Sequence, residues 1–130
     1  MPEMAGLDEG TPLFVQVADR LAGEIADGGL AEGERVPSTN ELAAFYRINP
    51  ATAARGINVL ADDGLLEKRR GIGMFVTAGA RQRLLAQRRA EFTRRHVEPL
   101  LTEAARLGID ADELSALIKE AGPEREGASV

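Results

Sequence analysis

Two helix-start signals follow each other closely in the middle of this chain, and they constrain its fold more than any other feature. Residues 38–41 (Ser-Thr-Asn-Glu) have the form of a capping box, in which the serine and glutamate side chains each bond a free backbone amide of the first helical turn. Asn49-Pro50 is a second start, because asparagine caps helices and proline fits the first helical position. The pattern predicts a short helix through Tyr46, a tight turn, and a second helix that Gly64 closes. This is the order of a helix-turn-helix unit.

The second of these helices has an apolar side and a side suited to DNA. Its apolar stripe consists of Ala53, Ile57 and Leu60. The opposite side carries Ala51, Thr52 and Arg55 near its start, whereas the aspartates at 62–63 would repel phosphate at its far end. Recognition helices insert their N-terminal half into the major groove, where Arg55 can pair with guanine or phosphate and Asn49 or Thr52 can bond bases or backbone. The alternative is that Asn49 and Thr52 only cap the helix and that Arg55 is a solvated charge.

A β-hairpin is predicted directly after this helix. Strand-like runs at 65–68 and 74–77 flank a glycine-rich tip, where Gly71 and Gly73 can supply positive φ. Lys68, Arg69 and Arg70 place three cations beside that tip, which suits a DNA backbone or a narrow minor groove. A solvated basic turn would explain the glycines, but it would not explain three adjacent cations next to a recognition helix.

Further helices are predicted on both sides of this region. Thr11, as cap, and Pro12 open a helix over 12–27, and the connector at 30–36 has room for a short strand. The apolar pattern over residues 81–107 predicts a long helix with a kink at Pro99. A capping box at 110–113 predicts the start of a last helix, which runs to about Ala121.

We therefore expect a mostly α fold with a small β-wing, in which two C-terminal helices follow a winged helix-turn-helix domain. The expected parts are a flexible tail at 1–10, a DNA-binding domain at 11–79, a helical dimerisation region at 80–121 and a disordered tail at 122–130.

The distribution of charge supports a nucleic-acid partner although the whole chain has a net charge of −5. Residues 1–45 carry a net charge of −7, residues 46–95 of +7 and residues 96–130 of −5. The basic middle contains the predicted recognition helix and wing, so the overall charge conceals a local electrostatic footprint.

The composition argues against several other classes of protein. The chain has no cysteine and a single histidine, His96, which argues against thiol chemistry, a zinc site and a histidine-based catalytic dyad. No phosphate-binding loop motif is present. We expect no enzyme, no metal and no cofactor. The apolar runs are too short to span a membrane and the N-terminus lacks the pattern of a secretory signal, so we expect a cytoplasmic protein.

The long helix predicts a homodimer. The helix is amphipathic, and its own C-terminal region is too small to cover its apolar side. A second copy of the chain would supply the missing surface. The alternative is that the helix folds back on its own winged domain. Its arginines, at 81, 83, 88, 89, 94 and 95, could attract DNA or pair with the acidic last helix. The candidate dimerisation residues are Leu85, Phe92, His96, Leu100, Leu107, Leu114 and Leu117.

Several motifs in this order closely resemble the GntR family of bacterial transcription regulators. They are Pro12-Leu13-Phe14, residues 36–43 (VPSTNELA), residues 49–55 (NPATAAR), and the stretch from Asp63-Gly64-Leu65 through the wing, so that the resemblance covers residues 11–77. The resemblance implies a winged helix-turn-helix that binds short palindromic operators as a homodimer. The short C-terminal region looks like the YtrA-type subfamily. The family often has arginine where this chain has Asn40, at an operator-contacting position.

The sequence thus predicts a transcription regulator, with repression inferred from the resemblance alone. A protein-interaction module and a DNA binder without sequence preference stay open as alternatives, as does a small-molecule effector between the long helices. The candidate DNA contacts are Ser38, Thr39, Asn40, Asn49, Ala51, Thr52, Arg55, Lys68, Arg69, Arg70, Gly71 and Gly73.

Overall fold

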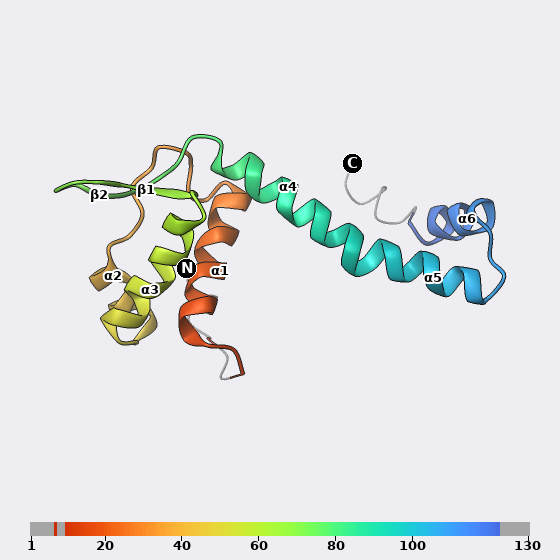
Figure 1. Cartoon of the computed structure of the whole chain (residues 1–130), viewed down its shortest axis with the longest axis horizontal. Coiled ribbons are helices and arrows are strands. Elements are labelled where there is room, and N and C mark those ends of the chain that lie inside the picture. The colour runs from red at the N-terminus through yellow and green to blue at the C-terminus, as the bar shows by residue number, and fades with distance from the viewer. Residues whose placement is uncertain (1–6, 8–9, 123–130) are drawn as a thin grey trace. The chain divides into compact units, whose positions relative to one another are not determined.

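The computed structural model describes residues 7 and 10–122, so most of the tails expected at 1–10 and 122–130 lies outside the described residues. The chain divides into two compact units, which meet between Gln87 and Arg88. The first unit contains α1 (Leu13–Asp27), α2 (Thr39–Tyr46), α3 (Pro50–Asp62), β1 (Leu66–Arg69), β2 (Gly73–Val76) and the start of α4 (Ala80–Phe92) (Figure 1). The second contains the end of α4, a π-helical turn (Thr93–Val97), α5 (Glu98–Arg106) and α6 (Ala111–Ala121). The predicted class, mostly α with a small β-wing, is confirmed.

Local capping explains where the two helices of the helix-turn-helix begin. The Ser38 hydroxyl accepts a hydrogen bond from the Glu41 amide at 3.1 Å, and the Ser38 amide donates to the Glu41 carboxylate at 2.7 Å. At the second start, the Asn49 side chain accepts from the Ala51 amide at 2.8 Å, with proline at the first helical position. Between the helices Arg47 adopts a left-handed backbone, with φ of 58°. Both predicted starts are confirmed.

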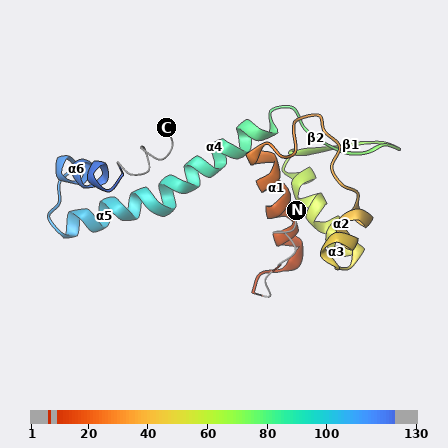
Figure 2. The ribbon, with the colours of Figure 1, turned by 180° about the vertical axis from the view of Figure 1, so that it is seen from behind.

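The core of the first unit lies between α1, α2 and α3. Helices α1 and α3 lie side by side in both ribbon views (Figure 2). A Cβ atom at Gly56 of α3 would lie 2.8 Å from a Val17 methyl and 3.0 Å from the Phe14 carbonyl oxygen, so only glycine permits this approach. The largest fully buried side chains are those of Val17, Leu21, Ile25, Val36, Leu42 and Val76.

Helix α1 begins one residue later than predicted. Pro12 is its cap residue and makes no side-chain capping bond, so the prediction of Thr11 as the cap was wrong. The Thr11 carbonyl instead accepts a hydrogen bond from the Gln16 side chain at 2.7 Å. Since Gln16 is buried, this bond satisfies its amide where water is excluded.

The wing is an antiparallel hairpin in which Leu66 faces Val76 and Arg69 faces Gly73. The connector adds a single bridge, Arg35 to Phe75, in place of a full third strand. Gly71 and Gly73 both have positive φ, of 77° and 137°, as the tip was expected to require.

The first turns of α4 are packed into the first unit. Ala80 and Leu84 lie in its hydrophobic core. The Arg81 guanidinium donates to the Ala26 carbonyl oxygen at 2.9 Å, near the end of α1, and Arg83 donates to the carbonyl oxygen of Gly64, just past the end of α3. Neither α1 nor α3 has a basic residue in its own last turn, so these arginines supply the positive charge that helix C-termini favour.

In the second unit the predicted long helix is interrupted by one π-helical turn just before Pro99, where the Glu98 amide bonds the Thr93 carbonyl. A wider turn accommodates a proline that lacks an N–H and crowds the carbonyl four residues earlier. The last helix, α6, begins at the predicted capping box, where the Asp110 carboxylate accepts from the Glu113 amide at 2.8 Å. Across the described residues, the helices are too short or too polar to cross a bilayer.

Candidate nucleic-acid interface

The N-terminal half of α3 presents a small, polar face with one cation. Ala51 and Arg55 are exposed and Thr52 is half-buried, whereas Ala53, Gly56 and Ile57 on the other side are buried. The Asn49 side chain is exposed and uses its oxygen as the cap acceptor, so its amide N–H groups are the part left for a base or phosphate. Because these side chains are small, the edge of a base pair could come close to the first two turns of α3.

Arg55 has an aromatic neighbour that the sequence analysis missed. Its guanidinium carbon lies 3.8 Å from the centroid of the Phe14 ring, on the first turn of α1. The two side chains line a shallow pocket of about 390 Å³, together with Leu13, Ala51 and Thr52. The contact joins residues far apart in the chain, and neither motif alone indicated it.

The start of α2 contributes three of the predicted site residues. Ser38 is half-buried, and its hydroxyl oxygen accepts the capping hydrogen bond from the Glu41 amide. Thr39 is half-buried and Asn40 is exposed. The hydrogen bonds from Ser38 also lower the pKa of the Glu41 carboxyl below its ordinary value, with a smaller contribution from the nearby charge of Arg35.

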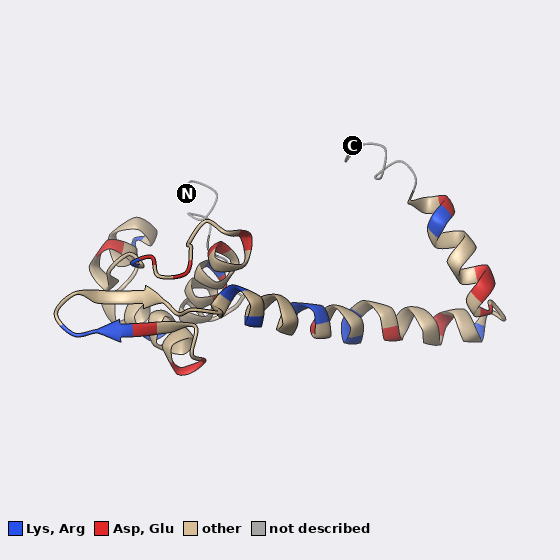
Figure 3. Cartoon of the chain, turned by 90° about the horizontal axis from the view of Figure 1, so that it is seen from above, with Lys and Arg blue, Asp and Glu red and all other residues tan. Residues whose placement is uncertain are grey.

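The wing carries all three predicted cations on its exposed surface (Figure 3). Arg69 lies over the Phe75 ring, with 4.1 Å from its guanidinium carbon to the ring centroid, and pairs with Glu67 at 3.4 Å. Arg35, which the sequence analysis also missed, donates to the Ile72 carbonyl oxygen at 3.2 Å. Gly73 has a φ of 137°, which side chains rarely adopt, whereas a Cβ atom there would meet only the exposed Arg35 side chain, at 3.0 Å.

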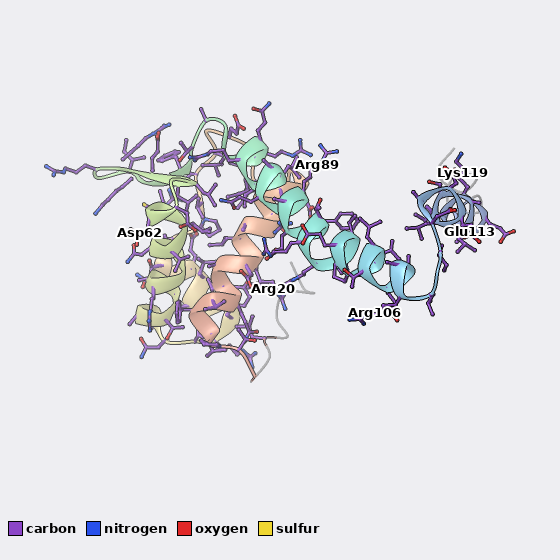
Figure 4. The ribbon with its side chains drawn as sticks, turned by 45° about the vertical axis from the view of Figure 1, so that its right-hand side comes forward. Arg20, Asp62, Arg89, Arg106, Glu113 and Lys119 are labelled. Carbon is purple, nitrogen blue, oxygen red and sulfur yellow. The ribbon has the colours of Figure 1, made fainter. Side chains whose placement is uncertain are left out.

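The C-terminal end of α3 is acidic, and an arginine from α4 binds the carbonyl oxygen that follows it. Asp62, which Figure 4 labels, lies at this end and is exposed, as is Asp63. Arg83 donates to the Gly64 carbonyl oxygen directly after the helix. A phosphate backbone is therefore disfavoured at the C-terminal end of α3 and favoured at its start.

The arginines of the long helix do not form one functional group. Arg81 and Arg83 bind main-chain carbonyl oxygens of the first unit, which is neither of the two uses expected from the sequence. In the second unit, Arg94 and Arg95 lie 3.5 and 3.9 Å from the carboxylate of Glu91. These later pairs are exposed and contribute little to stability.

Most of the predicted dimerisation residues expose apolar surface. Phe92 is 59% exposed, and its ring lies 5.4 Å from that of the exposed His96. Leu85 and Leu114 are half-buried. Of the predicted residues, four have exposed apolar side chains: Phe92, Leu100, Leu107 and Leu117. Leu101 and Ile118 of the second unit are exposed as well.

Comparison with known proteins gives the family. The model of the bacterial regulatory proteins of the gntR family matches residues 13–76. The chain is 25% identical over 117 residues to the HTH-type transcriptional repressor YtrA of Bacillus subtilis, covering 90% of this chain and 89% of that protein. This similarity extends beyond the wing into the C-terminal helices.

Two solved structures support the same assignment. A GntR-family transcriptional regulator from Bacteroides thetaiotaomicron is 28% identical, with a TM-score of 0.71, over 87% of this chain and 98% of that one. The DNA-binding domain of AraR, solved in complex with its operator ORX1, is 29% identical with a TM-score of 0.50, over 55% of this chain and 87% of that one. The helix-turn-helix, the wing and these matches together make the chain a member of the GntR family of bacterial regulatory proteins, a DNA-binding transcription regulator and not an enzyme.

Proposed function

We propose that this regulator is a repressor that binds a short palindromic operator as a homodimer. The observation that carries the proposal is the exposed face at the start of α3, which is small and polar, with one arginine, in the unit that also carries the basic wing. In the proposed complex this half of α3 enters the major groove, where Arg55 reads a base edge. Lys68 and Arg70 of the wing bind the backbone or minor groove beside each half-site.

The homodimer is proposed from the exposed apolar surface of the second unit. Phe92, Leu100 and Leu107 are 59%, 42% and 68% exposed in a single chain, and exposing them together is unfavourable in water. A second copy would cover them, and two copies related by a two-fold axis match a palindromic site. The similarity to the repressor YtrA supports repression. We place the protein in the cytoplasm, where bacterial DNA is accessible to it.

Selection of bound duplexes from a random pool, using the full chain, tests the proposal. We expect the selected sequences to contain an inverted repeat, and we expect two chains per duplex by light scattering of the complex. A transcription assay on a promoter that overlaps the selected site should then show less transcript when the protein is added.

The outcomes separate the proposal from its alternatives. Binding to all duplexes without a preferred sequence would indicate an architectural DNA binder. Absence of any salt-dependent binding to duplex DNA would favour a protein-interaction module. An increase in transcript from the overlapping promoter would contradict repression while leaving the operator in place.

A further inference from the structure

The side chains of Phe14 and Arg55 form a cation–aromatic contact between α1 and α3. The guanidinium carbon of Arg55 lies 3.8 Å from the Phe14 ring centroid, which is stacking distance for a cation over an aromatic face. Phe14 is half-buried on α1, while Arg55 is exposed on the DNA-facing half of α3. The contact therefore joins a half-buried ring on α1 to a cation on α3 that is open to solvent.

The residue next to Arg55 allows the first turns of α1 to lie close to α3. Gly56 has no side chain, and a Cβ atom there would lie 3.0 Å from the Phe14 carbonyl oxygen and 2.8 Å from Val17. Val17 is fully buried, so it holds the first turns of α1 against α3 at this point. The backbone of Phe14 thus has a defined position relative to the helix that carries Arg55.

Stacking leaves the useful part of the guanidinium free. All five N–H donors of arginine lie in the plane of the group, and an aromatic ring on one face of that plane does not occupy them. An arginine held in this way has already lost much of the conformational freedom that an unrestrained side chain loses on binding. Planar donors with a fixed direction are what bidentate pairing with guanine O6 and N7 requires.

We propose that Phe14 is a positioning residue for Arg55: its ring orients the guanidinium for a base edge before DNA arrives and thereby adds to operator specificity. The inference rests on the proposed role of Arg55 in reading the operator, and it assigns a part in recognition to a helix that does not enter the groove.

A double-mutant cycle in the full chain tests this inference, with the selected operator and a random duplex as probes. Phe14→Leu keeps an apolar side chain but removes the ring, and we expect operator binding to weaken about two- to fivefold, the range for an exposed cation–aromatic contact. Phe14→Tyr keeps the ring and should bind like the parent. In an Arg55→Ala background, Phe14→Leu should have no further effect, and binding of the random duplex should change little in either background.

A measurement on the free protein checks the orientation itself. In NMR spectra the side-chain protons of Arg55 should be shifted upfield by the Phe14 ring in the parent and in Phe14→Tyr, and this shift should disappear in Phe14→Leu. Thermal unfolding of each variant establishes that the fold is retained.

The possible results are distinguishable. If Phe14→Leu weakens operator binding equally with and without Arg55, Phe14 acts only through the fold and the inference is overturned. The same holds if the upfield shift is absent in the parent. If Arg55→Ala alone leaves operator binding unchanged, the proposed base-reading role of Arg55 fails first, and the inference fails with it.

Discussion

Lys68, Arg69 and Arg70 are neighbours in the sequence, but their side chains have different surroundings. Arg69 lies over the Phe75 ring and pairs with Glu67, so part of its charge is already balanced within the hairpin. Arg70 lies in the turn between β1 and β2, beside Gly71, and is exposed. Arg70 is therefore better placed for a phosphate than Arg69.

Replacing Arg70 should change how DNA binding depends on salt. If Arg70 neutralises one phosphate, Arg70→Ala should lower the slope of log K against log salt concentration by about 0.9 per wing, or roughly two for a dimer. The measurement is operator affinity at several salt concentrations. Arg70→Lys, which keeps the charge, should retain the parent slope, and an unchanged slope in Arg70→Ala would remove this side chain from the proposed interface.

At the scale of elements, Arg81 and Arg83 of α4, which bind carbonyl oxygens at the ends of α1 and α3, are expected to stabilise the first unit. Arg81→Ala removes both a hydrogen bond to the Ala26 carbonyl and a positive charge at the end of α1, which should cost about 1–2 kcal/mol of unfolding free energy. Urea unfolding of the full chain measures the loss. Arg88, which is exposed on the same helix, offers the matched control, and Arg88→Ala should change stability by less than about 0.5 kcal/mol. Equal losses in the two variants would show that the cap contributes nothing.

The capping box of α2 should give a pH-dependent contribution to stability. Its hydrogen bonds lower the pKa of Glu41 in the folded chain, so the contribution is fully present above the unfolded pKa of that carboxyl. It is lost as the pH falls through the lowered folded pKa. The stability difference between the parent and Glu41→Gln, measured by urea unfolding from neutral pH to below pH 4, should therefore move in favour of the Gln variant on acidification. A difference that does not vary with pH would contradict this linkage.

Elements determined by local chemistry could be predicted from the sequence, and contacts between distant segments could not. The starts at Ser38 and Asn49 depend on side chains within three residues of the amides they bond, so both were found. Gly56 is central to the packing of α1 on α3, yet its role depends on Val17, which is far away in the sequence. The contacts of Arg81 with α1 and of Arg55 with Phe14 were missed for the same reason.

At the scale of the whole molecule, the exposed apolar side chains of the second unit lead to a test of the proposed homodimer. Leu100→Glu places a charge on the surface that we expect to be buried between two copies, where an unpaired charge is strongly unfavourable. The full-length variant should be a monomer by light scattering. Its operator affinity should fall by roughly 100-fold or more, because binding two half-sites through one dimer supplies that avidity.

Leu100→Met is the control for that variant, since it nearly conserves volume and polarity. It should remain dimeric and bind the operator like the parent. A Leu100→Glu protein that is still dimeric would show that the second copy binds elsewhere, and the exposed leucines would then need another partner.

The anchoring of α4 in the first unit has a consequence for how this DNA-binding unit can be exchanged between proteins. Ala80 and Leu84 are part of its core, and Arg81 and Arg83 bind the ends of α1 and α3. A gene fusion joined at the glycine of residue 79 would discard all four side chains and leave apolar surface and helix ends uncovered. A fusion joined after Gln87 would keep them, so residues 80–87 must travel with the wing whenever the C-terminal region is replaced by a different one.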